Sequence, residues 1–437
     1  MIRRALTWGT SLALLVAACS SSPDGAADEN SSGTAGTPDL AGSAGESSSG
    51  GGPASSAGSA GTSNLAEGGA NAVGGAAGKA ASPEAGTSIG TGGSGMEAGV
   101  AHVVGQCSAL APVGQWEKIT PPGMRHGPAA FGVDPIHAGT VYLGTGDGCF
   151  DNKCDGVMKT TDCGATWAKA NTGKNGDLLD KGDQWGFAID PVDPSVMYTT
   201  SGYGANGLYK STNGGVDWED VTPKGDGSPG WVGSGIQLDP DDPHHLLIRW
   251  HAPCGKYEDQ IGCFAETKDG GVTWKEHYGT PNWEPEVTPY LLHGSTWIIN
   301  VNGISLTTDG GATYKKVSDA GAGGHSAGGI YRGKGGSYYV GTMGGVLRSA
   351  PGAEGSSWAV APGSGSWVQG VTGNGGSIFA ASGGGVLSAP ESNGLGWTAV
   401  PSSPRHGDGC FTGYDQDHHV LYASCMADSG FWRMVTQ

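Results

Sequence analysis

Two acidic residues, Asp183 and Glu284, each lie within two positions of a tryptophan, Trp185 and Trp283. An indole ring excludes water from a neighbouring carboxyl group and favours the protonated form of that group. One protonated and one ionised carboxyl group are what the cleavage of a glycosidic bond requires. We therefore take Asp183 and Glu284 as the candidate catalytic pair. Further candidate acids in the surrounding loops are Asp147, Asp155, Glu258, Asp259, Glu286 and Asp408.

Bulky aromatic and basic residues recur at similar points between predicted strands. An indole can stack on the apolar face of a sugar ring, and imidazole and guanidinium groups can bond its hydroxyl groups. This recurrence predicts a carbohydrate-binding face, although the same side chains could instead seal a central channel. The candidate substrate-binding residues are Trp185, Trp231, Trp283, Trp367, His126, His325, His406, Arg125 and Arg405.

A recurring eight-residue segment indicates how these residues are positioned. It reads TKDGGVTW at 267–274, and near copies stand at 160–167 (TTDCGATW), 211–218 (STNGGVDW) and 307–314 (TTDGGATY). The Asp or Asn can accept hydrogen bonds from backbone N–H groups just after it, and a following glycine can take positive φ. The closing aromatic ring can pack between neighbouring sheets. Each copy therefore predicts a tight turn that enters an outer strand.

The pattern S/T-x-D-x-G-x-T-W resembles the Asp-box, or BNR repeat, of sialidase-like, xyloglucanase-like and sortilin-like β-propellers. This resemblance implies that Asp162, Asn213, Asp269 and Asp309 are structural and lie opposite the active face. It also points to Asp147 or Asp155, because xyloglucanase-like enzymes carry a catalytic Asp in that loop of the first blade. Those enzymes take their second acid from a second propeller, which this chain lacks. The early Arg-Ile-Pro motif of sialidases is also absent.

The spacing of the closing aromatic residues predicts the number of blades. They are Trp116, Trp167, Trp218, Trp274, Tyr314, Trp358 and Trp397, spaced roughly 40 to 56 residues apart, which suits four-stranded blades. The segment 430–435 reads as a third strand, and 115–119 reads as a fourth strand. Pairing them would leave no open edge. We therefore expect an all-β fold, a single seven-bladed β-propeller of four-stranded antiparallel blades over residues 100–437, with the last blade closed by the N-terminal strand.

The first 99 residues have the composition of an export signal and a tether. Arg3 and Arg4 precede an apolar segment too short to span a membrane, which predicts a signal peptide over residues 1–18. The small residues before Cys19 resemble a bacterial lipobox, which implies a lipid on Cys19. Residues 19–99 are rich in Gly, Ser and Ala, and a segment so poor in apolar side chains should stay disordered. These features predict an exported, lipid-anchored protein of the outer membrane or cell surface.

The nine cysteines become eight when Cys19 carries a lipid, and an even number in an exported chain indicates disulfides. We expect pairs Cys254–Cys263 and Cys410–Cys425, because each pair can meet within one blade. The pairs Cys149–Cys154 and Cys107–Cys163 complete the set, although exchange among these four cysteines stays open. A zinc site formed by Cys149, Cys154 and Cys163 is the alternative.

Composition excludes some classes of function. The chain has 23 basic and 41 acidic residues, a net charge of −18, which argues against nucleic-acid binding. No stretch has convincing helical periodicity, and a phosphate-binding loop and a nucleophile elbow each need a helix after a strand, so we expect neither nucleotide chemistry nor serine hydrolysis, and no cofactor or metal. We expect a monomer that engages a polysaccharide, with glycoside hydrolysis as an open question. The alternative is a non-catalytic binding or assembly-factor propeller for a protein or membrane-complex partner.

Overall fold

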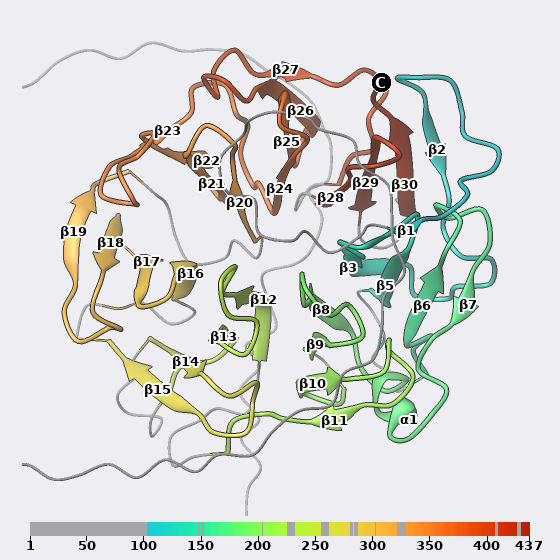
Figure 1. Cartoon of the computed structure of the whole chain (residues 1–437), viewed down its shortest axis with the longest axis horizontal. Coiled ribbons are helices and arrows are strands. Elements are labelled where there is room, and N and C mark those ends of the chain that lie inside the picture. The colour runs from blue at the N-terminus through green and yellow to red at the C-terminus, as the bar shows by residue number, and fades with distance from the viewer. Residues whose placement is uncertain are drawn as a thin grey trace, which may run out of the picture. The chain divides into compact units, whose positions relative to one another are not determined.

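A computed structural model of the chain shows seven four-stranded β-sheets arranged around a central axis (Figure 1). The described residues belong to one unit of the chain, Thr91–Gln437. They are 103–146, 149, 153–202, 204–224, 232–254, 262–279, 283, 287–301, 303–320, 329–406, 410–425 and 430–437.

Each of the seven sheets has four antiparallel strands, and the protein is an all-β, seven-bladed β-propeller. Blade one consists of β3 (Pro128–Val133), β5 (Val141–Thr145), β6 (Val157–Thr160) and β7 (Ala168–Lys169). Blade two consists of β8 (Gln184–Ile189), β9 (Met197–Ser201), β10 (Gly207–Ser211) and β11 (Glu219–Asp220). Blade three consists of β12 (Val232–Leu238), β13 (Leu246–Trp250), β14 (Cys263–Thr267) and β15 (Lys275–Tyr278). Blade four consists of β16 (Thr288–His293), β17 (Thr296–Asn300), β18 (Ile304–Thr307) and β19 (Lys315–Ser318). Blade five consists of β20 (Ile330–Arg332), β21 (Tyr338–Thr342), β22 (Gly345–Ser349) and β23 (Trp358–Val360). Blade six consists of β24 (Gly370–Gly373), β25 (Ser377–Ser382), β26 (Gly385–Pro390) and β27 (Thr398–Ala399).

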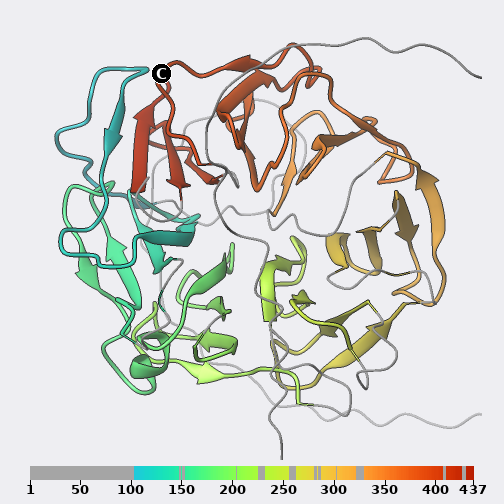
Figure 2. The same ribbon diagram turned by 180° about the vertical axis from the view of Figure 1, so that it is seen from behind.

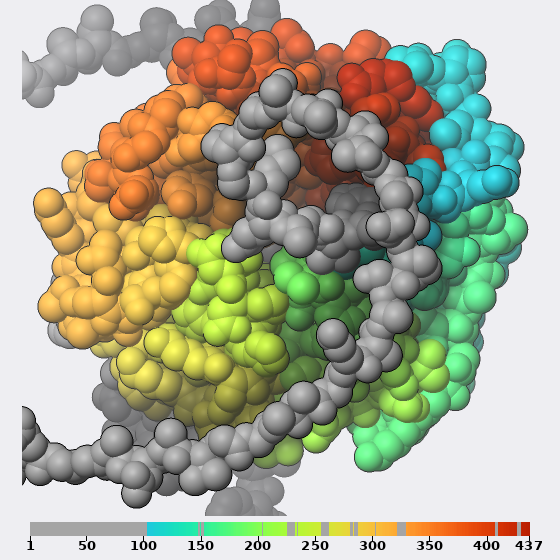
Figure 3. Space-filling view, in the orientation of Figure 1, coloured from blue at the N-terminus to red at the C-terminus, as the bar shows by residue number. Residues whose placement is uncertain are grey.

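The seventh blade combines segments from both ends of the described chain. Its inner three strands are β28 (Phe411–Asp415), β29 (Val420–Cys425) and β30 (Gly430–Val435), and its outer strand is β2 (Trp116–Lys118). β2 pairs antiparallel with β30, with Trp116 opposite Met434. The inner strand β28 contacts β3 of the first blade, so the ring of blades is closed (Figure 2). In the space-filling view the blades follow one another around this ring in chain order (Figure 3).

The core lies between the blades because the middle strands are buried on both faces. β13 and β17 are buried along their whole length. The large rings of Trp218, Trp297 and Phe431 belong to residues that are at most 2% exposed. Continuous apolar strands of this kind remove apolar area from water on each side of a sheet. Sheets that pack face to face in a ring therefore stabilise one another.

Four turns with the same sequence pattern share one geometry, and we call them the repeat turns (160–167, 211–218, 267–274 and 307–314). In the third, the Thr267 hydroxyl accepts from the N–H of Gly271 at 3.0 Å, and Asp269 Oδ1 accepts from the N–H of Thr273 at 2.8 Å. The hydroxyl of Thr273 donates to Asp269 Oδ2, and these bonds lower the pKa of Asp269 to about 2. Corresponding bonds join Gly164 to Thr160, Thr166 to Asp162, Gly215 to Ser211, Asp217 to Asn213, Gly311 to Thr307 and Thr313 to Asp309.

A second recurring turn joins the first and second strands of several blades. In it, one Asp oxygen accepts from backbone N–H groups two or three positions later, as Asp134 does from Ile136 and His137. In three of these turns a proline follows the Asp, at Asp134-Pro135, Asp190-Pro191 and Asp239-Pro240. The equivalent residues are Asp190, Asp239 and Asp415.

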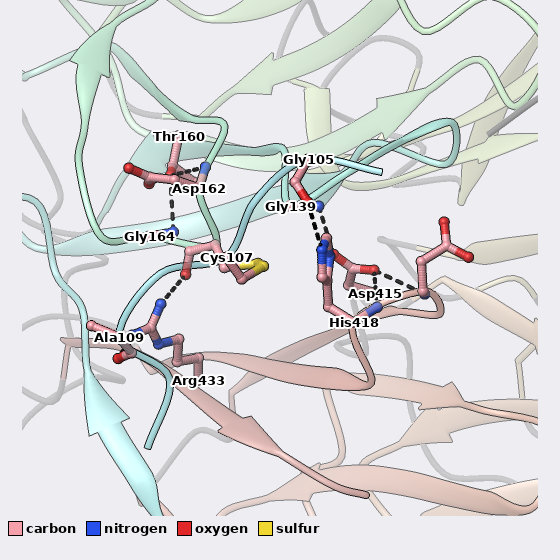
Figure 4. Close-up of a disulfide and its surroundings, with 12 residues drawn as sticks. Gly105, Cys107, Ala109, Gly139, Thr160, Asp162, Gly164, Asp415, His418 and Arg433 are labelled. Carbon is pink, nitrogen blue, oxygen red and sulfur yellow. Dashed lines mark hydrogen bonds and ion pairs between the residues drawn. A yellow bond between two sulfur atoms is a disulfide. The ribbon is translucent and has the colours of Figure 1, made fainter. Parts of the chain in front are cut away.

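A segment before the first blade ties that blade to the last one, and we call residues 103–109 the clasp. Its strand β1 (Val103–Val104) pairs in parallel with β4 (His137–Ala138). Cys107 is bonded to Cys163, and the Gly105 carbonyl accepts from His418 Nε2 at 2.9 Å (Figure 4). Arg433, which is 3% exposed, donates to the carbonyls of Ala109 and Cys163, both at 2.9 Å. The clasp is therefore attached to blade one by a disulfide and to blade seven by hydrogen bonds, and it links the two blades.

One short helix, α1 (Gly176–Leu179), lies in the connection between blades one and two. Among the described residues, no helix has the length and apolar character needed to cross a membrane.

Candidate functional site at the channel mouth

A cavity of about 200 Å³ lies on the propeller axis, at the N-terminal half of the inner strands. Its volume is below the 300–1,000 Å³ usual for small-molecule sites. A polymer would therefore have to lie across the mouth rather than fill the cavity. The lining includes Ala130, Phe131, Trp185, Gly186, Phe187, Gly235, Ile236, Gly329, Ile330, Gln369, Gly370, Val371, Phe411 and Thr412.

Trp185 is the predicted site residue that lines this cavity. It is half-buried, and its ring lies edge-on to the His251 ring, with 4.8 Å between the ring centres. Gly202 lies beneath the indole, and a Cβ atom there would come within 2.1 Å of the ring. The ring is therefore held in a fixed position at the axis.

Trp367 is exposed on the same face, in the connection that leads into β24. Its exposed fraction is 38%, and its backbone has φ of +51°. A bulky residue in this left-handed region is unusual and costs about 1–3 kcal/mol. The conformation is fixed because the N–H groups of Trp367 and Val368 donate to the carbonyls of Met343 and Thr342, both at 3.0 Å. A structural requirement alone would be met by glycine at lower cost.

Trp367 is exposed because the connections near it are too short to cover its ring. The connections between the second and third strands of blades four to six are short, at residues 301–303, 343–344 and 383–384. In blades one and three the same connections are longer, at 146–156 and 251–262. The first contains the Cys149–Cys154 disulfide, and the Cys254–Cys263 disulfide closes the second.

Asp183 is fully buried and does not line the cavity. Its Oδ1 accepts from the N–H of Cys149 at 3.3 Å, and its carbonyl accepts from the N–H of Gly202 at 3.0 Å. The next residue, Gln184, is also buried and accepts from the N–H of Thr145 at 2.9 Å. In the described structure Asp183 therefore holds the loop of blade one. Its proposed partner Glu284 lies outside the described residues, as do Trp231 and His325.

Trp283 lies away from the axis, between blades three and four. Its ring stacks on Phe264, with 5.9 Å between centres, and meets Tyr314 edge-on at 5.3 Å. It packs on the apolar cluster that contains Trp297. The described structure thus gives Trp283 a packing role and does not bring it together with Trp185.

The predicted basic residues lie in the connections that precede β3 and β28. The backbone N–H of Arg125 donates to Asp155 Oδ2 at 2.8 Å, and its guanidinium Nε lies 3.6 Å from Asp155 Oδ1. Arg405 is exposed, and its side chain packs beside Gly385. His126 and His406 are half-buried. Sequence reasoning missed Phe131, Gln369, Phe411 and Thr412 as channel residues; their positions at or near the starts of inner strands were the available signal.

The disulfides in the structure are Cys107–Cys163, Cys149–Cys154, Cys254–Cys263 and Cys410–Cys425, the pairs expected from the sequence. They contradict the alternative of a zinc site formed by Cys149, Cys154 and Cys163. Two clusters of possible metal ligands occur among the described residues, around Cys107 and around Cys149. Each contains a disulfide, and thiolates are the form of cysteine that binds zinc.

A connected group of titratable side chains lies between blades three and four. His245 Nδ1 is 2.8 Å from Asp239 Oδ2, and its Nε2 is 3.1 Å from Glu266 Oε1. Glu266 Oε2 is 2.7 Å from His277 Nε2. All four side chains are at most 5% exposed, so this group is part of the core and not a ligand site.

The fold and the axial site define a seven-bladed β-propeller with an aromatic-lined channel mouth. No family model matches the chain. The chain is 26% identical over 211 residues to a xyloglucanase of Paenibacillus sp., covering 41% of this chain and 19% of that protein. It is 28% identical over 180 residues to a xyloglucanase of Hypocrea jecorina, covering 38% and 19%. The chain thus spans about a fifth of the length of these relatives.

Two solved structures have the same fold. A GH74 xyloglucanase from Xanthomonas campestris superposes with a TM-score of 0.50 and 15% identity, covering 74% of this chain and 54% of that chain. The extracellular domain of a protein described as a hybrid two-component system, from B. thetaiotaomicron, gives a TM-score of 0.52 and 11% identity, covering 72% and 40%. At these identities the likeness concerns the fold alone.

Proposed function

We propose that this propeller binds a polysaccharide across the channel mouth, with Trp367 and Trp185 as stacking platforms. The observation that carries the proposal is Trp367, a large exposed ring held at positive φ on the face where Trp185 lines the axis. Its indole offers an apolar surface to a sugar ring, and Arg125, Arg405, His126 and His406 supply hydrogen-bonding groups on the same face. The partial similarity to proteins named xyloglucanase supports xyloglucan as the first ligand to test.

Hydrolysis is the further step of this proposal, with Asp183 and Glu284 as the two carboxyl groups. A buried Asp183 would have to become accessible before it could reach a glycosidic oxygen. Its bond to the N–H of Cys149 favours the non-catalytic alternative, in which the same face binds a glycan or a protein partner without cleaving it. In either case we propose that the four repeat turns are Asp-boxes with a structural role.

The test measures binding and the release of reducing ends on a panel of glycans that includes xyloglucan. Trp367→Ala and Trp185→Ala should weaken binding by about 1–3 kcal/mol each, the scale of one large apolar contact. Tyr278→Ala is the matched control, because Tyr278 is an exposed aromatic residue on the outer strand β15 and should leave binding unchanged.

Two acid variants separate an enzyme from a binding protein. If Asp183→Asn and Glu284→Gln abolish product but retain binding, the protein is a hydrolase; if product is never formed and the Trp variants lose binding, it is a lectin. A folded wild-type protein that neither binds nor cleaves any glycan would end the carbohydrate proposal in favour of a protein partner.

We also propose that the propeller is exported as a monomer and anchored by a lipid on Cys19, with residues 19–99 as a flexible tether. The lipobox-like sequence and the composition support this proposal. Metabolic labelling with palmitate should mark the wild-type protein and not Cys19→Ala. Label retained by Cys19→Ala, or a protease-resistant core that begins well before residue 99, would contradict it.

A further inference from the structure

A second pocket, of about 580 Å³, lies between blades one and two on the side of the repeat turns. It is separate from the axial cavity, since none of the described residues lines both. Its volume lies within the range of small-molecule sites. The wall includes Val103 of the clasp, His137, Tyr142, Lys159, Thr161 and Ser195.

Lys159 is the cation of this pocket. Its Nζ lies 4.8 Å from the centre of the Tyr142 ring, which stabilises a positive charge through the face of the ring. It is half-buried, and among the described residues it forms no ion pair with a carboxylate. An ammonium group without a carboxylate partner is notable in a chain with 41 acidic and 23 basic residues.

In the next blade the corresponding lysine, Lys210, has a structural role. Lys210 pairs across the strands with Tyr198, as Lys159 does with Tyr142, and its Nζ lies 5.4 Å from the Tyr198 ring centre. In addition, Lys210 donates to the carbonyl of Gly270 in the repeat turn of the following blade, at 2.8 Å. No such bond to a repeat turn is found for Lys159 in the described structure, and the pocket lies beside its ammonium group.

The other charged group in the wall is already engaged. Asp134 Oδ1 accepts from the N–H groups of Ile136 and His137, and Oδ2 lies 3.0 Å from His137 Nδ1. Because Asp134 fixes the Nδ1–H of His137, the Nε2 atom of the half-exposed ring is left to bond a ligand. The Ser195 hydroxyl donates to Asp193, which leaves its oxygen lone pairs as acceptors.

We propose that this pocket binds the carboxylate and hydroxyl groups of a uronic acid. Lys159 would hold the carboxylate by a charge-assisted bond, while His137 Nε2 and the Ser195 oxygen would accept from ring hydroxyls. Pro194 and Val103 give an apolar wall for the ring. The site lies away from the channel mouth and recognises charge, so it is distinct from the aromatic platforms proposed above.

The test titrates D-galacturonate and D-glucuronate into the full chain by NMR and calorimetry, with D-galactose and D-glucose as neutral counterparts. The uronates should bind and the neutral sugars should bind at least about tenfold more weakly, because a charged hydrogen bond is lost. Lys159→Gln should lower uronate affinity by a similar factor, and Lys159→Arg should retain most of it. Lys315→Gln, an exposed lysine on β19, is the matched control and should change nothing.

Equal binding of acidic and neutral sugars would overturn the proposal, and so would uronate affinity that Lys159→Gln leaves unchanged. A lack of uronate binding by the wild type would also overturn it. Thermal unfolding of Lys159→Gln checks that a loss of affinity is not a loss of fold. Trp367→Ala should leave uronate binding intact, so this result is independent of the outcome at the channel mouth.

Discussion

His245 has a carboxylate against each of its ring nitrogens, Asp239 at Nδ1 and Glu266 at Nε2. A neutral imidazole has one N–H, so only the doubly protonated ring can donate to both acids. Burial alone would lower the pKa of His245, but its hydrogen bonds to Glu266 and Asp239 raise it. Burial alone would raise the pKa of Glu266, but hydrogen bonds from His245 and His277 lower it. A buried imidazolium therefore holds two acids of blade three together.

This cluster predicts a pH range of greatest stability. The raised pKa of His245 gives stability that is fully present below about 6.5 and is lost as pH rises through the folded pKa. The lowered pKa of Glu266 gives stability that is present above about 4.5 and is lost as pH falls. His245→Gln should cost about 3–5 kcal/mol, because a buried pair loses one partner, and should flatten the loss of stability above about pH 6.5.

Urea unfolding of the full chain between about pH 5 and 9 measures the cost of His245→Gln and its effect on the pH dependence of stability. His244→Gln is the matched control, since the neighbouring His244 has 71% of its side chain exposed beside Asp242 and should change the unfolding free energy little. An unchanged pH dependence in His245→Gln would show that the ring is not charged.

At the scale of elements, the constant part of each blade is the closing aromatic residue rather than the acid of the repeat turn. Trp218 Nε1 donates to the carbonyl of Gly215 at 2.8 Å. Blades five and six lack the acid, yet Trp358 donates to Gly355 at 2.7 Å and Trp397 to Gly394 at 3.1 Å. The aromatic ring and its bond to a glycine carbonyl persist where the Asp is lost.

This difference predicts unequal effects of two substitutions. Trp218→Ala removes a side chain that is 2% exposed and should cost about 3–5 kcal/mol. Asp309→Asn should cost far less, because Asn213 occupies the equivalent position and makes the same backbone bond. Hydrogen bonds from Thr313 lower the pKa of Asp309 to about 2, so its contribution is lost as pH falls from about 4 towards 2. Chemical denaturation at neutral pH compares the variants, and a larger loss for Asp309→Asn would refute this ranking.

At the scale of the whole molecule, the clasp and β2 hold the ring closed where the two ends of the described chain meet. The bond from Arg433 to the Cys163 carbonyl and the bond from the N–H of Gly139 to Asp415 join blades seven and one directly. The Cys107–Cys163 disulfide and the bond from Arg433 to the Ala109 carbonyl attach the clasp to blade one and to blade seven. The other three disulfides close local segments.

The disulfides should therefore differ in their contribution to stability. Cys107 and Cys163 are separated by 56 residues, and Cys149 and Cys154 by 5. Loop-closure entropy predicts a loss of about 4 kcal/mol for the double variant Cys107→Ser, Cys163→Ser, and about 2 kcal/mol for Cys149→Ser, Cys154→Ser. Thermal unfolding under non-reducing conditions compares the two; equal losses would mean that the clasp does not constrain ring closure.

The sequence was sufficient to predict the blades, because aromatic residues and turns repeat at the period of the fold. It was less informative about the site, since residues at similar chain positions take different places. Trp185 lines the axis, whereas Trp283 packs between blades three and four. Lys159 and Lys210 have similar neighbours in sequence, and only packing against the next blade distinguishes a pocket residue from a structural one. These differences depend on tertiary contacts that no local pattern encodes.

The central claim, that a polysaccharide lies across the channel mouth, is tested most directly by hydrogen–deuterium exchange of the full chain with and without xyloglucan. The proposed function predicts protection of amides in the segments around Trp367 and Trp185, in residues 362–369 and 181–187. It predicts no change in the repeat turns at 160–167 and 267–274, which lie on the opposite side of the blades. Protection of the repeat turns with none at Trp367 would contradict the account.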